Sequence, residues 1–110
     1  MSITVELADL PGRIAGRTAQ AYLVTVRDRR PHVVSVTPTV RDDGALVVGA
    51  GRRTARNIAE HPEVTLLWPV DADDPTHSLL VDGTAAPTPD GEDLVITPTS
   101  AILHRVRAGR

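Results

Sequence analysis

Residues with a branched β-carbon dominate this chain and restrict it to a mainly β fold. Of its 110 residues, 14 are valine, 12 are threonine and 5 are isoleucine, whereas Tyr22 and Trp68 are its two aromatic residues. β-Branched side chains have few χ1 rotamers and pack well on a pleated sheet, so they favour strands over helices. Without phenylalanine, the core has to be built from small aliphatic side chains. Such side chains let backbone layers, or a flat ligand, approach closely.

Apolar runs between turn-forming residues predict a series of short antiparallel strands. The runs at residues 21–26 and 32–37 flank a polar turn and predict a hairpin. The run at residues 45–48 follows a second turn, at 42–44, and is expected to pair with the strand before it. Further strands are predicted at residues 63–68, 78–85, 94–97 and 101–106, with the last two forming either one strand or two.

Two short helices are predicted among these strands. The first covers residues 9–19, with Asp9 as its N-cap and Pro11 in its first turn. The second covers residues 52–61, with Thr54 as its N-cap, and ends before a proline. About six strands joined hairpin by hairpin, with two short helices, predict a small antiparallel barrel, because closure removes exposed sheet edges. Residues 1–110 are expected to form a single domain.

Charge and hydropathy exclude several classes of function. The 12 basic residues, all arginine, face 14 acidic ones and give a net charge of −2, so a general nucleic-acid binder is not expected. No apolar run approaches the roughly 18 residues needed to span a bilayer. Because the first residues carry acid and lack an apolar signal core, a cytoplasmic location is expected.

The residues that usually carry hydrolytic or metal chemistry show no suitable spacing. Cysteine is absent, which excludes disulfides, thiolate zinc sites and cysteine nucleophiles. The acidic segment at residues 71–76 lacks the spacing of a calcium loop and is expected to be a solvated surface loop. The histidines are too widely separated to form a metal-binding helix motif, so no metal site is expected. They are His32, His61, His77 and His104.

Residues 49–56, Gly-Ala-Gly-Arg-Arg-Thr-Ala-Arg, predict an anion-binding site where a strand leads into a helix. Glycines permit close backbone approach, a helix N-terminus offers free N–H groups and a partial positive charge, and guanidinium groups match phosphate oxygens. Three arginines at this place would otherwise repel one another. A solvated basic helix start is the alternative, since the segment is neither a Walker loop nor a Rossmann fingerprint.

The stretch at residues 51–69, Gly-Arg-Arg-Thr-Ala-Arg-Asn-Ile-Ala-Glu-His-Pro-Glu-Val-Thr-Leu-Leu-Trp-Pro, resembles a helix and the following strand of a known family. This is the pyridoxamine 5′-phosphate oxidase-like, FMN-binding split β-barrel family. Residues 21–26 and 31–38 resemble the family's first two barrel strands, and residues 81–85 resemble its fifth. The resemblance implies a mainly β, small antiparallel split β-barrel that binds flavin mononucleotide (FMN).

Carried over position by position, the resemblance implies which residues bind the cofactor. The helix start would hold the phosphate, the second strand would line the ring, and an aromatic residue would lie near the ring and the subunit interface. Because Thr54 and Arg52 replace a lysine and a serine of the family's oxidases, guanidinium groups would carry more of the phosphate binding. For the valines and the tryptophan, packing in the barrel core is the alternative. The implied residues are Gly51, Arg52, Arg53, Thr54 and Arg56 for the phosphate, Val33, Val34, Ser35, Val36 and Thr37 for the ring, and Trp68.

The resemblance further implies a homodimeric oxidoreductase with FMN at the dimer interface and an unidentified small substrate. A thin core in so short a chain also favours a homodimer. No segment resembles the C-terminal Trp- and Arg-containing part of genuine pyridoxamine phosphate oxidases, so that activity is not expected. One alternative is the same fold with an 8-hydroxy-5-deazaflavin coenzyme, for whose acidic tail Arg13 and Arg17 are candidates. Others are a noncatalytic flavin- or haem-binding module and a barrel that has lost its ligand.

Overall fold

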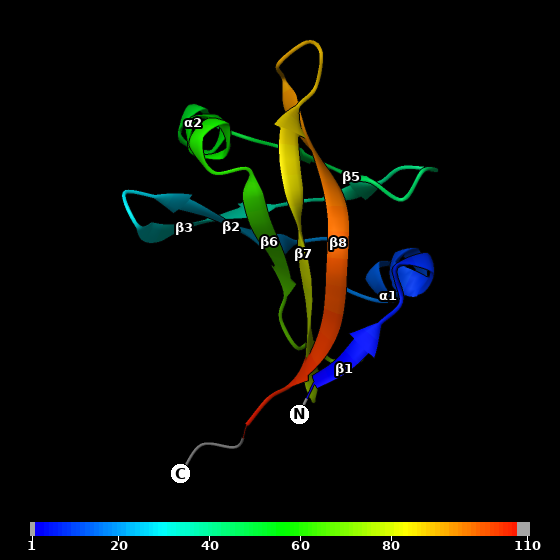
Figure 1. Ribbon diagram of the computed structural model, residues 1–110. Helices are drawn as coiled ribbons and strands as arrows, with labels where there is room; N and C mark the ends of the chain where they lie inside the picture. The colour runs from blue at the N-terminus through cyan, green and yellow to red at the C-terminus, as the bar shows by residue number, and fades with distance from the viewer. Residues whose placement is uncertain (1, 108–110) are drawn as a thin grey trace.

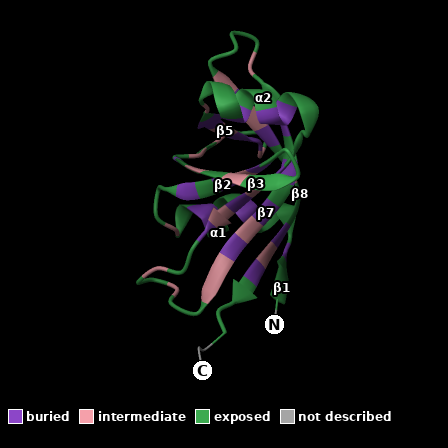
Figure 2. Cartoon of the chain, turned by 90° about the vertical axis from the view of Figure 1, so that its left-hand side faces the viewer, coloured by how far each residue is buried: buried purple, intermediate pink, exposed green. Residues whose placement is uncertain are grey.

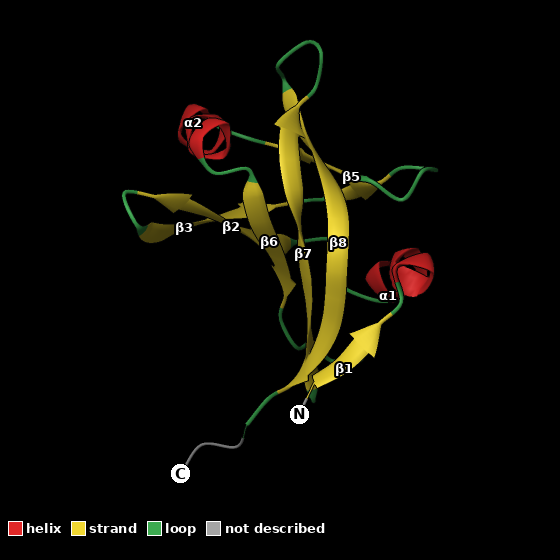
Figure 3. Cartoon of the chain, viewed as in Figure 1, coloured by secondary structure: helices red, strands yellow, loops and turns green. Residues whose placement is uncertain are grey.

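The chain folds into one antiparallel sheet that curls into a half-barrel and carries two short α-helices (Figures 1 and 3). The mainly β split barrel expected from the sequence is therefore confirmed. The computed structural model describes residues 2–107. Its elements in chain order are β1 (Ser2–Val5), the 3₁₀ turn η1 (Leu7–Asp9), α1 (Leu10–Ala15), β2 (Ala21–Arg27), β3 (Arg30–Val36), β4 (Thr39–Val40), β5 (Leu46–Gly49), α2 (Arg52–Glu60), β6 (Glu63–Trp68), β7 (His77–Pro87) and β8 (Asp93–Arg105).

A long ribbon formed by β7 and β8 organises the sheet. The strand order is β3-β2-β6-β7-β8-β5-β4, and β1 joins the sheet separately, through β8. The first half of β8 pairs with β5, where Ile96 faces Leu46, and its second half pairs with β1, where Ala101 faces Val5. Because two different strands share one edge of β8, the sheet divides there, and β8 bends between them (Figure 1).

A register shift between Asp82 and Gly83 marks the bend in the ribbon. A Cβ atom at Gly83 would lie 2.5 Å from the carbonyl oxygen of Thr97 and 3.1 Å from Cγ2 of Ile96. The backbones of β7 and β8 therefore approach so closely that glycine is required on the β7 side. Such irregularities increase strand twist and curvature, which a curled sheet needs.

The core fills the concave side of the sheet. Side chains alternate between the two faces of each strand, and bands of buried and less buried residues alternate along β7 in Figure 2. The helices close the ends of the core, α1 through Leu10 and Ile14 and α2 through Ile58. Within residues 2–107, no helix is long and apolar enough to cross a membrane.

An ion pair between Arg17 and Asp74 fastens the loop before β7 to the segment after α1. The Arg17 guanidinium, whose side chain is 5% exposed, donates to Asp74 Oδ2 at 2.9 Å and to the His77 carbonyl at 2.8 Å. Asp74 Oδ1 accepts hydrogen bonds from the N–H groups of Thr76 and His77. Burial raises the pKa of Asp74, but the hydrogen bonds from Thr76 and His77 and the Arg17 charge together hold it below its ordinary value. The acidic segment 71–76 is the mostly exposed surface loop that was expected, and the Asp74 carboxylate anchors it to Arg17.

The predicted helix boundaries need correction. The first helix does not extend over residues 9–19, because α1 ends at Ala15 and Gly16 follows it. Asp9 makes no capping hydrogen bond through its side chain. Thr54 is not an N-cap, because α2 begins two residues earlier, with Gly51 as its cap.

The predicted strand pairing also needs correction. The hairpin of β2 and β3 forms as expected, with Asp28 and Arg29 at positive φ in its turn. The prediction that residues 45–48 pair with the strand at 32–37 is wrong. β5 pairs with β8 on one side and with the two-residue strand β4 on the other. Residues 94–97 and 101–106 belong to one strand, β8, and β1 was not predicted. The described residues thus form eight strands where about six were expected.

The close approach at Gly83 makes a specific prediction about stability. We expect Gly83→Ala to lower the free energy of unfolding by about 3 kcal/mol, because the added methyl group meets backbone and not a movable side chain. Gly12→Ala is the matched control, since a Cβ there meets nothing within 4 Å and alanine is the better helix former. Urea denaturation of both variants measures the difference, and equal losses would contradict the role of the bulge.

The Arg17–Asp74 ion pair predicts how stability responds to acid. Because the pKa of Asp74 is lower in the folded chain, its contribution is complete above the ordinary value of 3.8 and is lost as pH falls through the folded pKa. We expect Asp74→Asn to lower the melting temperature at pH 7 and to flatten its fall below about pH 4. Asp73→Asn, an exposed neighbour in the same loop, should keep the wild-type profile. If the melting temperatures of wild type and Asp74→Asn fell in parallel as the pH is lowered, the stabilising role of the Asp74 carboxylate would be contradicted.

Candidate functional site

A cavity of about 410 Å³ lies between edge strand β3 and the start of α2. Its β3 side is formed by His32, Val34, Ser35 and Val36, and its opposite side by residues 49–54, which connect β5 to the first turn of α2. The two sides come from segments that do not pair with each other in the sheet. The cavity therefore lies at the seam of the half-barrel.

Hydrogen bonds between buried side chains hold α2 against this seam. Asn57 Nδ2 of α2 donates to Thr25 Oγ1 of β2 at 3.1 Å, and both residues are buried. Thr25 faces His32 across the hairpin, and its hydroxyl oxygen lies 3.5 Å from His32 Nδ1. Because buried polar groups must be satisfied, this contact fixes the position of α2 along β2 and, through it, the position of the helix start beside β3.

The start of α2 offers uncompensated hydrogen-bond donors to the cavity. Gly51 caps the helix without a side-chain hydrogen bond, and the first turn contains no acidic residue. The first helical bond runs from the Ala55 N–H to the Gly51 carbonyl, so the three N–H groups between these residues have no partner within the helix. Within residues 2–107, no carboxylate lies within 4 Å of the guanidinium groups of Arg52 and Arg53.

This arrangement suits an anion with a flat apolar group attached. Helix N–H groups and guanidinium groups bind phosphate, and a Cβ at Gly51 would meet nothing within 4 Å, so the backbone is open to a ligand there. Val34 and Val36 supply an apolar wall beside it. The volume lies within the range of about 300 to 1,000 Å³ that is typical of small-molecule sites. Residues 2–107 contain no group of His, Cys, Asp and Glu placed to hold a metal.

The structure brings most of the predicted cofactor residues together, and their roles stay predictions. Four lie elsewhere. Val33 is 54% exposed on the other face of β3, Thr37 lies just after that strand, Arg56 is exposed on α2, and Trp68 is buried in the core with 1% exposed. Those that line the cavity are Gly51, Arg52, Arg53, Thr54, Val34, Ser35 and Val36.

His32 also lines the cavity and was not predicted, whereas Gly49 and Ala50 line it as members of the predicted anion-binding segment 49–56, although neither was assigned to the cofactor. The alternation of β3 could have indicated His32, which is two residues from Val34 and so lies on the same face. The position of Gly49 and Ala50 follows from the pairing of β5 with β8, which local sequence does not reveal.

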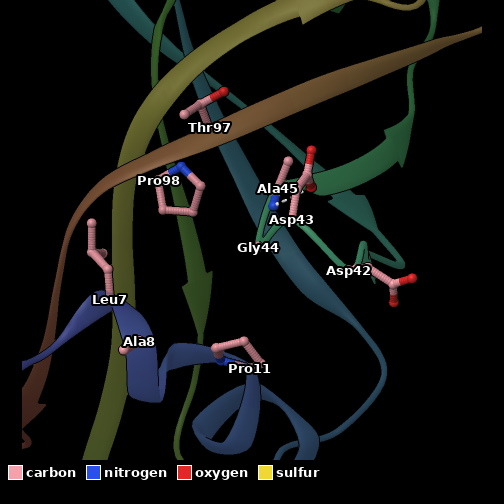
Figure 4. Close-up of a pocket in the computed structure, with 9 residues that line it drawn as sticks. All are labelled: Leu7, Ala8, Pro11, Asp42, Asp43, Gly44, Ala45, Thr97 and Pro98. Carbon is pink, nitrogen blue, oxygen red and sulfur yellow. Dashed lines mark hydrogen bonds between the residues drawn. The ribbon is translucent and has the colours of Figure 1, made fainter.

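A second cavity, of about 490 Å³, lies between the N-terminal helical segment and the β4–β5 turn (Figure 4). Its walls are apolar at Leu7 and Pro98 and acidic at Asp42 and Asp43. Asp43 accepts hydrogen bonds from the Ala45 N–H and from Arg41, and these bonds, with the Arg41 charge, hold its pKa below the ordinary value. Because this cavity is lined by carboxylates and by no arginine or histidine, it does not suit a phosphate.

Comparison with solved structures defines the class of fold. An FAD-binding protein from Mesorhizobium loti matches with a TM-score of 0.71 at 14% identity, over 94% of this chain and 96% of that one. A candidate pyridoxamine 5′-phosphate oxidase from Listeria innocua matches with a TM-score of 0.67 at 18% identity, over 89% and 98%. An F420 reductase matches with a TM-score of 0.58 at 19% identity, over 86% and 92%. The chain thus has the split-barrel fold of pyridoxamine 5′-phosphate oxidase-like proteins.

Sequence comparison places the chain in a narrower group. It is 41% identical over 100 residues to uncharacterized proteins of Mycobacterium bovis and Mycobacterium tuberculosis. The match covers 77% of this chain and 70% of each relative. The chain belongs to the same family as these mycobacterial proteins. No known family model matches it.

Proposed function

We propose that this protein binds a flavin cofactor in the cavity between β3 and α2 and acts as an FMN-dependent oxidoreductase on a small substrate. The observation that carries the proposal is the meeting, in one cavity, of the open helix start with its arginines and the apolar face of β3. These are the two parts that the sequence resemblance assigned to phosphate and ring. The fold shared with an FAD-binding protein and with an F420 reductase supports it.

In this proposal, each part of the cavity has a separate task. Arg52, Arg53 and the first N–H groups of α2 hold the phosphate, while Val34 and Val36 position the ring. When bound, a flavin supplies hydride and electron transfer, so the protein needs no acid–base pair of its own. Among residues 2–107, no carboxylate lines the cavity, so the phosphate would have no repelling neighbour there.

A homodimer is part of the proposal, because the convex face of the sheet carries an apolar row across several strands. Tyr22 of β2, 43% exposed, pairs with Leu67 of β6, which pairs with Leu80 of β7 and, beyond it, Ile102 of β8. Val33 extends this surface onto β3. Since β3 also forms the cavity wall, a partner subunit seated on this face would border the cofactor.

A deazaflavin coenzyme in the same cavity is the second candidate, favoured by the shared fold with an F420 reductase. Of the two arginines suggested for its acidic tail, Arg17 is already bonded to Asp74 and His77, whereas Arg13 is exposed. Titrations with FMN and with the deazaflavin, followed by absorbance, distinguish the two. A flavin that binds but is reduced by no nicotinamide donor would favour a noncatalytic module.

The phosphate site predicts a selective loss of affinity. We expect Arg53→Ala to weaken FMN binding roughly ten- to hundredfold, because it removes a charge-assisted hydrogen bond of about 1.5 to 3 kcal/mol. Riboflavin, which has no phosphate, should bind weakly to wild type, and its affinity should fall little further in the variant. Arg41→Ala, at an exposed ion pair with Asp43, is the control. Fluorescence titration measures all of these affinities.

The ligand-free Arg53→Ala protein should melt no lower than wild type, since the change relieves repulsion at the positive helix end. An FMN affinity within about twofold of wild type, or an equal loss for riboflavin, would show that the segment is only a solvated helix start.

The apolar row predicts the effect of a charge on assembly. We expect Tyr22→Asp to convert a dimer into an 11.7 kDa monomer in sedimentation experiments at micromolar concentration, because a carboxylate would be buried at the subunit contact. FMN affinity should fall with it. Val70→Asp, at a similarly exposed loop position, should leave both unchanged. A wild-type protein that sediments only as a monomer would refute the dimer.

A further inference from the structure

Half of the arginines of this chain lie in two short segments, each of which contributes arginines to the lining of a cavity. Of the 12 in the sequence, six fall into two short segments, one at the β2–β3 turn and one at the start of α2. The chain as a whole is acidic, with a net charge of −2, so this concentration is a local feature. The six are Arg27, Arg29, Arg30, Arg52, Arg53 and Arg56.

A smaller cavity lies at the β2–β3 turn, beside the cavity between β3 and α2. It has a volume of about 270 Å³ and is lined by Arg27, Asp28, Arg30, Pro31 and His32. His32 lines the α2 cavity as well. Because His32 lines both, the two cavities are neighbours.

The register of the hairpin places its arginines on the side that faces α2. Arg27 pairs with Arg30, and two residues along each strand Thr25 pairs with His32. Because side chains alternate, all four lie on the same face of the hairpin. This is the face that contacts α2, since Thr25 accepts the hydrogen bond from Asn57.

The arginines of α2 reach the same place from the other side. Arg53 precedes Asn57 by four residues and so lies one turn earlier on the same side of the helix. It lines the α2 cavity together with His32. The two groups of arginines thus flank one histidine.

Both groups are electrostatically unfavourable in the free protein. Like charges directly opposite on paired strands repel, as Arg27 and Arg30 do, and basic residues oppose the dipole at a helix start. Asp28 is the one carboxylate that lines the smaller cavity, and it is 87% exposed and 3.7 Å from Arg27 Nε. Within residues 2–107, no carboxylate lies within 4 Å of Arg30. Arg30 and the arginines at the start of α2 thus lack a carboxylate within 4 Å among the described residues, and Arg27 has only an exposed one, which is what a ligand with two anionic groups would require.

We propose that Arg27 and Arg30 form a second anion subsite, continuous with the phosphate site at α2. The inference rests on the proposed function and makes it more specific. The subsite extends the proposed flavin site toward a cofactor with a further anionic group beyond the phosphate that FMN also carries, so FMN would fill only part of the combined site. Both a flavin dinucleotide and a deazaflavin with an acidic tail have this chemistry, and in either case the tail lies at the hairpin and not at Arg13 or Arg17.

Titration of wild-type protein with FMN, FAD and the deazaflavin coenzyme tests the subsite. We expect FAD or the deazaflavin to bind at least about tenfold more tightly than FMN. Arg30→Thr should lower the affinity for the tighter-binding ligand about tenfold and leave the affinity for FMN within about twofold of wild type. Arg53→Ala should lower the affinity for every ligand. Arg105→Ala is the charge-matched control. If Arg30→Thr weakens the binding of FAD, the subsite holds the further anionic group of the dinucleotide. If it weakens the binding of the deazaflavin, the subsite holds the acidic tail.

The outcomes separate this inference from the proposed function. Equal affinity for all three ligands, or an equal loss of FMN and the tighter ligand in Arg30→Thr, would overturn the subsite and leave the flavin site standing. If none of the three binds, the proposed function fails, and inorganic pyrophosphate then decides the subsite. Chemical-shift changes in the backbone amides of residues 27–30 and 32 that disappear in Arg30→Thr would support it, and their absence from wild type would overturn it. Arg30→Thr should melt no lower than wild type, which shows that the hairpin remains folded.

Discussion

The ribbon of β7 and β8 is the constraint from which the rest of this fold follows. The glycine at position 83 lets two backbones approach more closely than any side chain would allow, and the ribbon bends at that point. The bend allows β8 to pair with β5 along one half and with β1 along the other. The sheet therefore opens at β8 and curls toward β3, which makes it a split barrel and not a continuous one.

The candidate site is a consequence of this opening. Because β5 pairs with β8, the chain after β5 has to reach β6, which pairs with β2. The helix α2 forms this connection and lies over the seam. Burial of Ile58 and the hydrogen bond between Asn57 and Thr25 fix the helix at one place. Its N-terminus then points its free donors toward edge strand β3. A barrel closed by hydrogen bonds would have no comparable space at this position.

The arginines of this protein fall into two groups, those paired with a carboxylate within the fold and those without such a partner among the described residues. Arg17 is buried and satisfied by Asp74, and this pair fastens a loop to the body of the fold. Arg30, Arg52 and Arg53 have no such partner among the described residues and gather around His32. Because repulsion between unpaired guanidinium groups costs stability, their clustering at one seam is better explained by a ligand than by folding.

Local sequence determined the class of fold, the hairpin of β2 and β3, the helix at 52–60 and the residues that begin it, because side-chain shape, turn chemistry and glycine placement act over a few neighbouring residues. Residue types alone indicated residues 51–54 as an anion site, whereas residues 34–36 were indicated by the resemblance to the split-barrel family. Tertiary structure alone decided that β5 pairs with β8, that Trp68 lies in the core and that His32 joins two cavities. The reason is physical: strand pairing between distant segments depends on how the whole sheet curls, and that curvature depends on the close packing at Gly83, which is distant in sequence from the residues that line the candidate site.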